Sequence, residues 1–477
     1  MSKKLFGTDG IRGVANTELT PELAFKLGRA VVATLPEEAF ALRSSSGSDE
    51  ESTALRRPRI LIGRDTRRSG NMLEGALSAG ITSAGADAVS AGIVPTPAVA
   101  LLIKDELFDA GIVISASHNP PEYNGLKVFL GGGKKLSDEQ EAQIEELLHT
   151  EDVPLPLLCD VNETLPCRAS RPLGTALGRS ETLPSAINDY VKKLVEIFPI
   201  NALSGMKVAI DCGHGASSLS TPAAFKALGA EVTVLNDDFN GDDINVNCGS
   251  TNLGIIAECV QSGSFDLGIA HDGDADRMLA VDEHGNEVDG DHIIAICAKY
   301  LKETGQMGDV PVVGTIMANL GFNKALESMG IPVELTAVGD RYVLERMYET
   351  NAVLGGEQSG HLIFLQHNST GDGLLSALML STIVAKSGQS LSELAKVMTS
   401  YPQELINIPV ASKDIEGCEP LQKAMHAAEE QLGDSGRILV RASGTEKKIR
   451  VMVEAQDATQ AVTIAEALAT IVREQLG

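Results

Sequence analysis

The sequence contains no tryptophan, and aromatic residues make up only 4% of its 477 positions. Aromatic side chains provide the stacking surfaces on which single-stranded bases and sugars bind, so a stacking platform is not expected. Basic residues are also outnumbered, with 39 Lys and Arg against 65 Asp and Glu and a formal net charge of −26. Because nucleic-acid affinity depends on neutralising phosphates with Lys and Arg, the composition excludes a nucleic acid as partner.

The chain has few cysteines and no long apolar run. Its seven cysteines are scattered and form no Cys-x-x-Cys pair, which argues against a zinc site and favours buried thiols in a reducing compartment. No apolar run approaches the ~18 residues of a membrane span. The first ten residues contain no apolar signal-peptide core. We therefore expect a cytoplasmic protein without a membrane partner.

The length and the apolar content are those of a protein with several cores. At roughly 150 residues per domain, 477 residues predict three or four domains. Two stretches interrupt the regular patterning. Residues 43–58 are rich in Ser and acidic residues and predict an exposed loop insertion, and residues 151–184 are rich in proline and predict an extended connection.

A pattern of strand, turn, helix and strand recurs three times, over residues 60–89, 208–234 and 312–335. Short apolar strands alternating with helices predict βαβ units and largely parallel sheets. A glycine follows each helix and predicts a left-handed cap; the three are Gly85, Gly229 and Gly330.

The remaining segments predict further elements. Apolar residues from Ile187 to Phe198 fall on one helical face. The tail has short strands over 437–441 and 449–454 and a helix that extends through Ile471, which together indicate a small α+β domain. Ser137 with Gln140 predicts a helix capping box.

The first candidate for chemistry is the polar loop Ser115-Ala116-Ser117-His118-Asn119-Pro120, which follows a buried strand over 112–114. Ligands of open α/β sheets bind outside the carboxyl ends of the strands. Ser117 at such a place can act as a nucleophile or carry a phosphoryl group. The alternative is an ordinary turn closed by Pro120, and the absence of a G-x-S-x-G elbow argues against a serine hydrolase.

The second candidate is the acidic loop formed by Asp272, Asp274 and Asp276, which follows an apolar strand over 267–270. Three carboxylates at every second residue can converge on one hard cation, and oxygen ligands without thiolates favour Mg²⁺. An EF-hand is excluded because Arg277 stands where its glycine is required. The alternative is a solvated acidic loop.

Two further loops carry polar groups suited to a ligand. Residues 355–361 (GGEQSGH) combine close backbone approach with hydrogen-bonding side chains on Glu357, Ser359 and His361. Residues 441–446 (RASGTE), with Arg450 nearby, combine backbone N–H groups, hydroxyls and arginines that can cradle a phosphate. The alternatives are a tight turn for the first loop and a charged surface turn for the second.

One pattern points to a different class of protein. Gly213-x-Gly215-x-x-Ser218 follows a strand and opens a helix, close to a dinucleotide fingerprint, with Asp237 as the only acidic candidate for a ribose ligand. Because Ser218 replaces the third glycine, a dinucleotide-dependent oxidoreductase is the alternative from an unrelated class.

Taken together, the serine, acidic, GGEQSGH and RASGTE loops resemble the motifs of the α-D-phosphohexomutase family, in the family's order and over nearly the whole chain. The resemblance implies an α/β fold with four domains around a central cleft. Three are related α/β/α domains with mixed, largely parallel sheets, and the fourth is a smaller C-terminal α+β domain. The expected bounds are 1–185 for the phosphoserine domain, 186–297 for the metal domain, 298–400 for the sugar domain and 401–477 for the phosphate domain.

The resemblance also implies an activity. Ser117 would be a phosphoserine that exchanges its phosphoryl group with a hexose phosphate through a 1,6-bisphosphate. The opening FGTDGIRG, Gln358 and VGDRYV over 338–343 favour glucosamine 6-phosphate and glucosamine 1-phosphate, which feed UDP-N-acetylglucosamine synthesis. Mannose or glucose phosphates are the alternative within the family, and a silent sugar-phosphate binding protein is a third possibility.

The resemblance assigns roles to individual residues. One Mg²⁺ per active site would be bound by Ser117, Asp272, Asp274 and Asp276. Catalytic roles fall on Ser117, Arg12, Lys127, His118 and His361. Substrate binding falls on Arg277, Gly339, Arg341, Glu357, Ser359, Arg441, Ser443, Gly444, Thr445 and Arg450. A homodimer is also implied. The chain departs from the family pattern at Ala442 and Lys447, where prolines are usual, and at Asn252, where histidine is usual.

Overall fold

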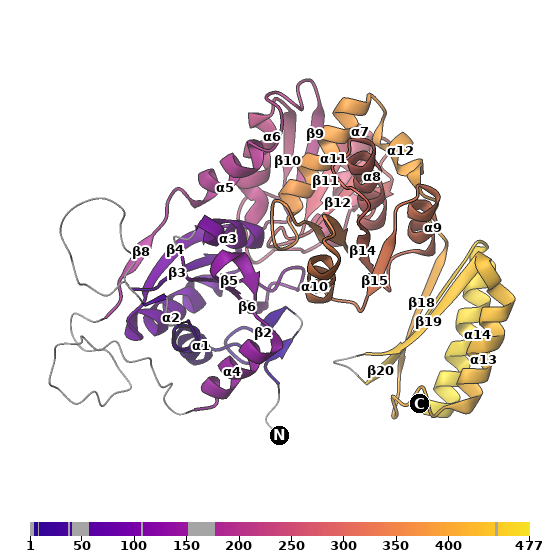
Figure 1. Ribbon diagram of the computed structural model, residues 1–477, viewed down its shortest axis with the longest axis horizontal. Helices are drawn as coiled ribbons and strands as arrows, with labels where there is room; N and C mark the ends of the chain where they lie inside the picture. Colours follow the sequence, from indigo (N-terminus) through magenta and orange to yellow (C-terminus); the bar gives the residue numbers. More distant parts are fainter. Residues whose placement is uncertain are drawn as a thin grey trace. The chain divides into compact units, whose positions relative to one another are not determined.

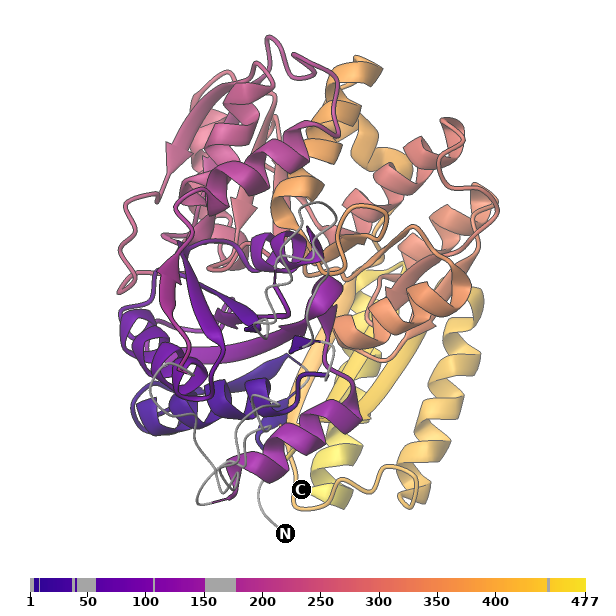
Figure 2. The same cartoon turned by 60° about the vertical axis from the view of Figure 1, so that its left-hand side comes forward.

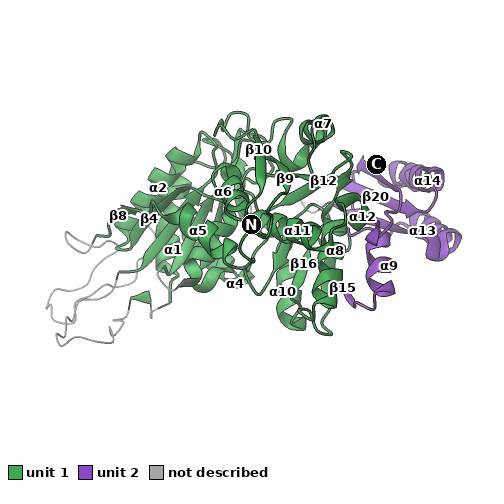
Figure 3. Cartoon of the chain, turned by 90° about the horizontal axis from the view of Figure 1, so that it is seen from above, with its two compact units in different colours: residues 1–316, 334–395 green, residues 317–333, 396–477 purple. Residues whose placement is uncertain are grey.

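The computed structural model describes residues 4–7, 9–36, 39–40, 57–105, 108–150, 177–443 and 447–477. Most of the predicted insertion over 43–58, most of the predicted connection over 151–184, and Gly444 and Thr445 lie outside these residues. The chain forms two compact units, the first comprising Met1–Ile316 with Glu334–Ala395 and the second Met317–Val333 with Lys396–Gly477 (Figure 3). Among the described residues, every helix is too short or too polar to span a bilayer.

The first unit begins with a mixed sheet in the order β1-β2-β6-β5-β3-β4-β8, with β7 on the outer part of β6. The strands β5, β3, β4 and β8 run parallel, and β1, β2, β6 and β5 pair antiparallel. The strands are β1 Phe6–Gly7, β2 Gly10–Val14, β3 Arg59–Arg64, β4 Asp87–Ile93, β5 Ala110–Ile114, β6 Tyr123–Leu130, β7 Lys134–Lys135 and β8 Ser180–Thr182. The predicted strands over 60–62 and 112–114 are thus confirmed.

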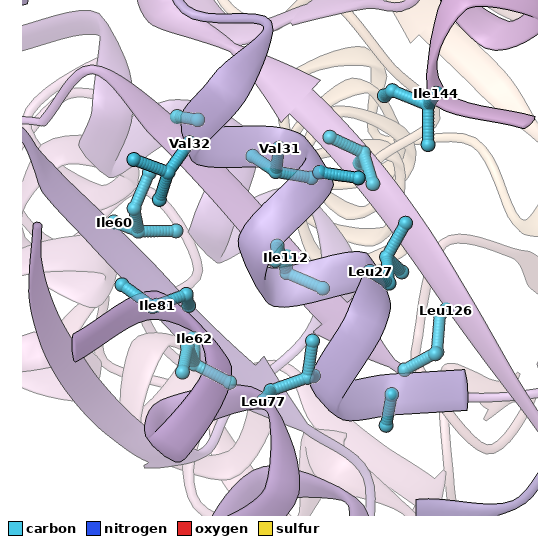
Figure 4. Packing of buried hydrophobic residues seen from close by; sticks show 14 of the residues in the cluster. Leu27, Val31, Val32, Ile60, Ile62, Leu77, Ile81, Ile112, Leu126 and Ile144 are labelled. Carbon is cyan, nitrogen blue, oxygen red and sulfur yellow. The ribbon is translucent and has the colours of Figure 1, made fainter. Parts of the chain in front are cut away.

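Helices cover both faces of this sheet (Figures 1 and 2). They are α1 Pro21–Ala33, α2 Gly70–Ser83, α3 Thr96–Leu102 and α4 Asp138–Leu148. On one face, α1 and α2 pack against Ile60, Ile62 and Ile112 (Figure 4). On the other, α3 lies so close that a Cβ on Gly111 would be 2.8 Å from Val99. Because helices pack on both faces, this part of the unit is an α/β/α sandwich. Each aliphatic side chain fully buried in it contributes about 1.5–3 kcal/mol to the stability of the fold.

The second sheet of the first unit has the order β10-β9-β11-β12-β13, in which β10, β9 and β11 are parallel and the rest antiparallel. Its elements are β9 Lys207–Asp211, α6 Ser220–Ala227, β10 Glu231–Leu235, α7 Gly254–Ser262, β11 Leu267–His271, β12 Met278–Asp282 and β13 Glu287–Val288. The preceding helix α5 (Ala186–Val195) is shorter than the predicted 187–198, because Pro199 disfavours a helical Phe198.

The third sheet has the order β15-β14-β16-β17, with β14 and β16 parallel and β16 and β17 antiparallel. Its elements and flanking helices are α8 Gly290–Glu303, β14 Val312–Thr315, β15 Val333–Thr336, α10 Asp340–Thr350, β16 Leu354–Gly356, β17 Leu362–Phe364, α11 Gly373–Ser387 and α12 Leu391–Leu394. The sequence predicted the strands over 312–313 and 333–335, and the structure confirms them. Helix α11 is buried along twelve of its fifteen residues.

The second unit contains an antiparallel sheet in the order β18-β20-β19, with α13 and α14 against one face (Figure 1). Its elements are α9 Leu320–Ser328, β18 Gln403–Pro409, α13 Glu419–Leu432, β19 Gly436–Ala442, β20 Lys448–Ala455 and α14 Ala458–Leu476. Ala461, Ile464 and Leu468 of α14 are buried, as the helical spacing predicts. The predicted α+β character of the tail is confirmed.

Local signals at the helix ends also hold. Gly85, Gly229 and Gly330 have φ of 88°, 93° and 67°, the left-handed conformation expected of a glycine after a helix. Ser137 and Gln140 form the predicted capping box at the start of α4. Of the described cysteines, four are buried and Cys259 is half-buried, in agreement with the predicted buried thiols.

Candidate active site

Ser117 stands one turn beyond the carboxyl end of β5 and is almost completely buried. Its Oγ donates a 2.6 Å hydrogen bond to Oδ2 of Asp272 and lies 3.2 Å from Nδ1 of His118. Its φ is 53°, a left-handed conformation that costs a non-glycine residue roughly 1–2 kcal/mol. Such a backbone persists only where surrounding contacts fix it, so the serine is held facing the acidic loop.

Arg67 supplies most of those contacts. Its guanidinium is fully buried, and its Nε donates to Oδ2 of Asp65 at 2.9 Å. The two terminal nitrogens donate to four backbone carbonyls, those of Ser117, Asn119 and Pro120 in the serine loop and that of Tyr123 at the start of β6. All five N–H donors of the arginine therefore have acceptors, which its planar fork alone can achieve.

The peptide of Ser117 is fixed from its other side and from a second sheet. Ser115 Oγ accepts from the N–H of Ser117 at 2.9 Å and donates to Asp65 at 2.6 Å. Nδ2 of Asn245, which belongs to the β9–β11 part of the unit, donates to the same Ser117 carbonyl at 2.9 Å and to that of Asn119 at 3.3 Å. Arg67 and Asn245 thus share two carbonyl acceptors.

Our sequence prediction did not include Asp65, Arg67 or Asn245. A signal for the first two was available, because residues 63–67 (GRDTR) directly follow β3, which lies parallel to β5. The carboxyl ends of adjacent parallel strands share one edge of the sheet, where polar side chains meet. No comparable signal marks Asn245.

Asp272, Asp274 and Asp276 follow β11 and are buried, and one oxygen from each lies within 4.8 Å of the others. Oδ1 of Asp274 and Oδ1 of Asp276 are buried without a hydrogen-bond partner among the described residues. Burial, followed by the charges of Asp276 and Asp274, raises the pKa of Asp272 well above its usual value. Converging carboxylates with unpartnered oxygens have the composition of a site for an oxygen-loving cation, so this loop is a candidate metal site.

Thr96, at the start of α3, orients one of these carboxylates. Its Oγ1 donates to Oδ2 of Asp274 at 2.6 Å, and its N–H donates to the Asp274 carbonyl at 2.9 Å. Hydrogen bonds of this kind fix the direction of a metal ligand. The metal loop is therefore held by a helix of the first sheet.

Lys127 of β6, one of the two predicted catalytic cations, lies at this acidic centre. Its Nζ lies 2.8 Å from Oδ2 of Asp274, 3.1 Å from Oδ2 of Asp276 and 2.8 Å from Oδ2 of Asp9. Arg12 of β2 contacts the same oxygen of Asp9 at 2.5 Å and Oδ1 of Asn119 at 3.1 Å. The predicted catalytic cations are thus joined by one carboxylate that the prediction did not include.

Further charged pairs continue from Asp9. Lys135 of β7 lies 3.3 Å from Oδ1 of Asp9 and forms an ion pair with Asp340, the first residue of α10. Oδ2 of Asp340 lies 3.5 Å from Nε2 of His361. We call this run of alternating charges the charge chain; its members are Asp274 with Asp276, Lys127, Asp9, Lys135 and Asp340.

The GGEQSGH loop follows β16 and places its polar groups beside α10. Oε1 of Glu357 accepts from the N–H of Gly339 at 3.2 Å. Nε2 of His361 accepts from the N–H of Gly371 at 3.2 Å, and its Nδ1 is buried without a partner among the described residues. Oγ of Ser359 is likewise buried and unpartnered within that part of the chain, so it has hydrogen-bonding capacity for a ligand.

Arg277 and Arg341 are the two remaining arginines among the predicted site residues of the first unit, and they lie in different settings. Arg277 follows the metal loop, and its Nε lies 3.9 Å from Oδ1 of Asp276. Arg341 instead forms ion pairs with Asp138 and the buried Glu141 of α4. These partners already engage the terminal nitrogens of Arg341. Its role in substrate binding stays a prediction.

The surroundings of His118 lower the pKa of its imidazole. Burial, with the nearby charges of Arg277 and Arg12, lowers its pKa to about 4. The imidazole is therefore neutral at neutral pH and can accept a proton or a hydrogen bond beside Ser117.

The predicted phosphate-binding residues lie in the second unit. Arg441 and Arg450 stand directly opposite each other on β19 and β20. Burial and the charge of Arg450 lower the pKa of Arg441, the sign of two cations held together. Ser443 is buried beside them, with Lys413 donating to its carbonyl at 2.5 Å. Like charges across a strand pair are unfavourable without an anion, so this arrangement suits one.

The glycine pattern at 213–218 has a packing explanation. A Cβ on Gly215 would lie 2.5 Å from the carbonyl oxygen of Gly273 in the metal loop. A Cβ on Gly273 would in turn lie 2.8 Å from the carbonyl oxygen of Ser117. Gly215, which is part of the pattern that suggested a dinucleotide-binding fold, therefore allows the close approach of Gly273 in the metal loop. Asn252, whose role was open, accepts from the N–H of Gly254 at the start of α7.

Comparisons with known proteins agree with this geometry. Four models of the phosphoglucomutase/phosphomannomutase family match the chain: α/β/α domain I at residues 3–154, domain II at 188–285, domain III at 289–401 and the C-terminal domain at 405–471. Proteins named phosphoglucosamine mutase from Clostridium novyi and Geobacillus kaustophilus are each 47% identical, with 99% of both chains covered.

Solved structures share the fold. A phosphoglucomutase/phosphomannomutase family protein from Burkholderia thailandensis matches with a TM-score of 0.76 at 22% identity, covering 98% of this chain and 97% of that one. The N-acetylphosphoglucosamine mutase of Aspergillus fumigatus, solved with GlcNAc-6P and magnesium, matches with a TM-score of 0.61 at 20% identity, covering 87% and 82%.

Proposed function

The chain belongs to the phosphoglucomutase/phosphomannomutase family, and from this premise we propose that it is a phosphoglucosamine mutase. It interconverts glucosamine 6-phosphate and glucosamine 1-phosphate. The observation that carries the proposal is the buried Ser117, whose Oγ lies 2.6 Å from Asp272 at the metal site. The full-length identity to phosphoglucosamine mutases favours this substrate over mannose or glucose phosphates. Its product feeds UDP-N-acetylglucosamine synthesis.

We propose Mg²⁺ as the metal, bound by Asp272, Asp274, Asp276 and an oxygen on Ser117. When bound, it would neutralise and polarise the phosphoryl group carried by the serine. The support is the chemistry of the donors, which are all oxygens and include two buried carboxylate oxygens without partners among the described residues.

In the proposed reaction, phosphorylated Ser117 gives its phosphoryl group to O1 of glucosamine 6-phosphate. The bond between Oγ and phosphorus breaks as the bond between O1 and phosphorus forms, and the proton of the O1 hydroxyl ends on Oγ of the serine. The resulting 1,6-bisphosphate then reorients so that its O6 phosphoryl group faces Ser117. Transfer of that group to Ser117 releases glucosamine 1-phosphate. Phosphoryl transfer depends on positioning and charge neutralisation. Arg12 and Lys127, joined through Asp9, supply positive charge beside the serine.

The remaining predicted residues are proposed to hold the substrate. Glu357 and Ser359 bind sugar hydroxyls, with Gly339 and Arg277 beside them, and His118 and His361 assist the transfer of the hydroxyl proton. Phosphate binding is proposed for Arg441, Ser443, Gly444, Thr445 and Arg450 of the second unit. A cytoplasmic location and a homodimer stay predictions.

A direct test compares three substrates and follows the serine. We expect coupled assays to show higher kcat/KM for glucosamine phosphate than for glucose or mannose phosphate, and intact-protein mass spectrometry to place a phosphoryl group on Ser117. Ser117→Ala should lower turnover at least 1,000-fold, because no other group can carry the phosphoryl. Ser83→Ala, at the end of α2, is the matched control and should keep wild-type turnover. Full activity in Ser117→Ala would overturn the phosphoserine proposal.

A further inference from the structure

Asp9 sits at the middle of the charge chain and is bound to three cations. Its Oδ2 contacts Arg12 at 2.5 Å and Lys127 at 2.8 Å, and its Oδ1 contacts Lys135 at 3.3 Å. One fifth of its side chain is exposed, so the cluster is largely shielded from solvent. In such surroundings ion pairs are screened weakly and the removal of one member affects the others.

Lys127 also touches the metal site. Its side chain is 4% exposed, and its ammonium divides its contacts between Asp9 and two carboxylates of the triad, Asp274 and Asp276. A divalent cation bound by the triad would compete with this ammonium for the same two carboxylates and would repel it. Asp9 is the one carboxylate contact of Lys127, among the described residues, that lies outside the triad.

We propose that Asp9 is a positioning residue for the metal site: it retains Lys127 beside the serine when the triad carboxylates turn to a metal. Lys135 fixes the direction of the Asp9 carboxylate by holding its other oxygen, and Asp340 holds Lys135. The inference deepens the proposed function and rests on the metal-dependent part of it.

The proposal fixes the sign of each effect on metal affinity. Without the Asp9 charge, Lys127 binds Asp274 and Asp276 more tightly, so a metal must displace a stronger competitor. Without Lys127, the competitor is gone, so the metal binds more tightly and Asp9 loses the partner through which it acts. A general effect of one negative charge on the local potential would instead act equally in both backgrounds.

The test is a double-mutant cycle read by calorimetric titration of Mg²⁺ into the unphosphorylated full-length protein. We expect Asp9→Asn to weaken Mg²⁺ binding about 10-fold, Lys127→Met to strengthen it, and the double variant to match Lys127→Met within about twofold. Asp138→Asn, which removes the same charge from an exposed site on α4, is the control and should leave the affinity unchanged. Wild-type affinity in Asp9→Asn, or an equal loss in both backgrounds, would overturn the proposal.

A kinetic readout separates positioning from folding. Asp9→Asn should lower kcat 10- to 100-fold with KM for glucosamine 6-phosphate within threefold, while thermal unfolding reports whether the fold is kept. If Asp9→Asn does not fold, Lys135→Met keeps the Asp9 charge but frees its Oδ1, and it should weaken Mg²⁺ binding about threefold; an unchanged affinity there would overturn the proposal. Because the titration needs no turnover, it still tests Asp9 if the chain acts on another phosphosugar.

Discussion

Ser117 has an unfavourable backbone conformation, and Arg67 is the side chain that stabilises it. A lysine at position 67 keeps the charge but has three donors on one nitrogen, so it cannot reach four carbonyls and Asp65 together. The left-handed peptide of Ser117 would then relax, and Oγ would lose its direction toward Asp272. The position thus requires the shape of an arginine as well as its charge.

We predict that Arg67→Lys lowers kcat 10- to 100-fold while KM changes less than threefold, because the serine is displaced and the substrate contacts are kept. It should also lower the free energy of unfolding by about 3 kcal/mol, since buried acceptors lose their donors. Steady-state kinetics and urea unfolding measure both effects. The neighbouring Arg68, 83% exposed and paired with Asp242, provides the control. Arg68→Lys should match the wild type, and an equal loss of kcat in both variants would contradict the role of the buried fork.

Residue identity predicted some of this site and missed the rest for a physical reason. Ser117 and the three aspartates stand out because short motifs follow apolar strands. Asp9 lies within the opening FGTDGIRG, but nothing in that motif indicates its contact with Lys135, which is 126 positions away in the chain. Contacts of that range depend on how the sheets fold and cannot be obtained from spacing.

At the scale of elements, Glu283 after β12 anchors the short helix α12. Its carboxylate accepts from the N–H of Ser392 at 3.1 Å and from the hydroxyl of the same residue. Partial burial raises the pKa of Glu283, but hydrogen bonds from Ser390 and Ser392 outweigh burial and lower it to about 2. A carboxyl whose folded pKa lies below its unfolded value of about 4.3 stabilises the fold above that value, and the contribution is lost as the pH falls toward 2.

We therefore predict that Glu283→Gln destabilises α12 by on the order of 2 kcal/mol at pH 6, and that this difference shrinks between pH 4.5 and 2. Hydrogen exchange of the α12 amides, compared between wild type and variant at each pH, measures it. Glu393→Gln in the same helix keeps an acceptor for the N–H of Ser390 in the capping box, so it serves as a control for the loss of a carboxylate that does not accept from Ser392. A difference that stays constant down to pH 2 would contradict the assignment.

Element types were largely predictable and their mutual placement was not. Apolar runs gave strands such as β5 and β11, and glycines such as Gly229 marked the helix ends, because these signals are local. The pairing of Arg341 with Glu141 joins α10 to α4 and depends on the contact between two sheets. The family resemblance is the basis of the substrate-binding role predicted for Arg341, and that role stays a prediction.

At the scale of the whole molecule, a buried network joins three segments of the first unit that are distant in sequence. Asp372, the N-cap of α11, accepts from the Tyr190 hydroxyl at 2.7 Å and from Nδ2 of Asn368 at 3.0 Å. The same Asn368 nitrogen donates to the carbonyl of Pro97 at 3.1 Å. Tyr190 lies on α5, Pro97 on α3 and Asn368 before α11, so one set of hydrogen bonds ties the three sheets together.

Tyr190→Phe removes one donor from a buried carboxylate and should lower the free energy of unfolding by about 1–3 kcal/mol. Urea unfolding followed by circular dichroism measures the change. Tyr348→Phe is the matched control, since that ring is 48% exposed, and its effect should stay within about 0.5 kcal/mol. Equal stability of the Tyr190 variant and the wild type would show that the network does not support the fold.

Domain division illustrates the limit of sequence at this scale. The four predicted domains follow motif order, whereas the structure groups Met317–Val333 with the C-terminal residues in the second unit. Which segments pack together is decided by long-range burial, for example by Glu454 accepting from the N–H of Leu320 at 2.8 Å. The bounds at 185, 297 and 400 therefore stay predictions.

The contact of Gly215 with Gly273, and of Gly273 with the Ser117 carbonyl, has a consequence for how the enzyme can evolve. Neither glycine carries a group that takes part in chemistry, yet any side chain at either position would push the serine away from its carboxylate partner. We therefore expect substitutions to be tolerated poorly at Gly215 and Gly273, as at the reacting groups themselves. A substitution at Gly215 or Gly273 is expected to disturb the serine loop, although neither residue has a reacting group.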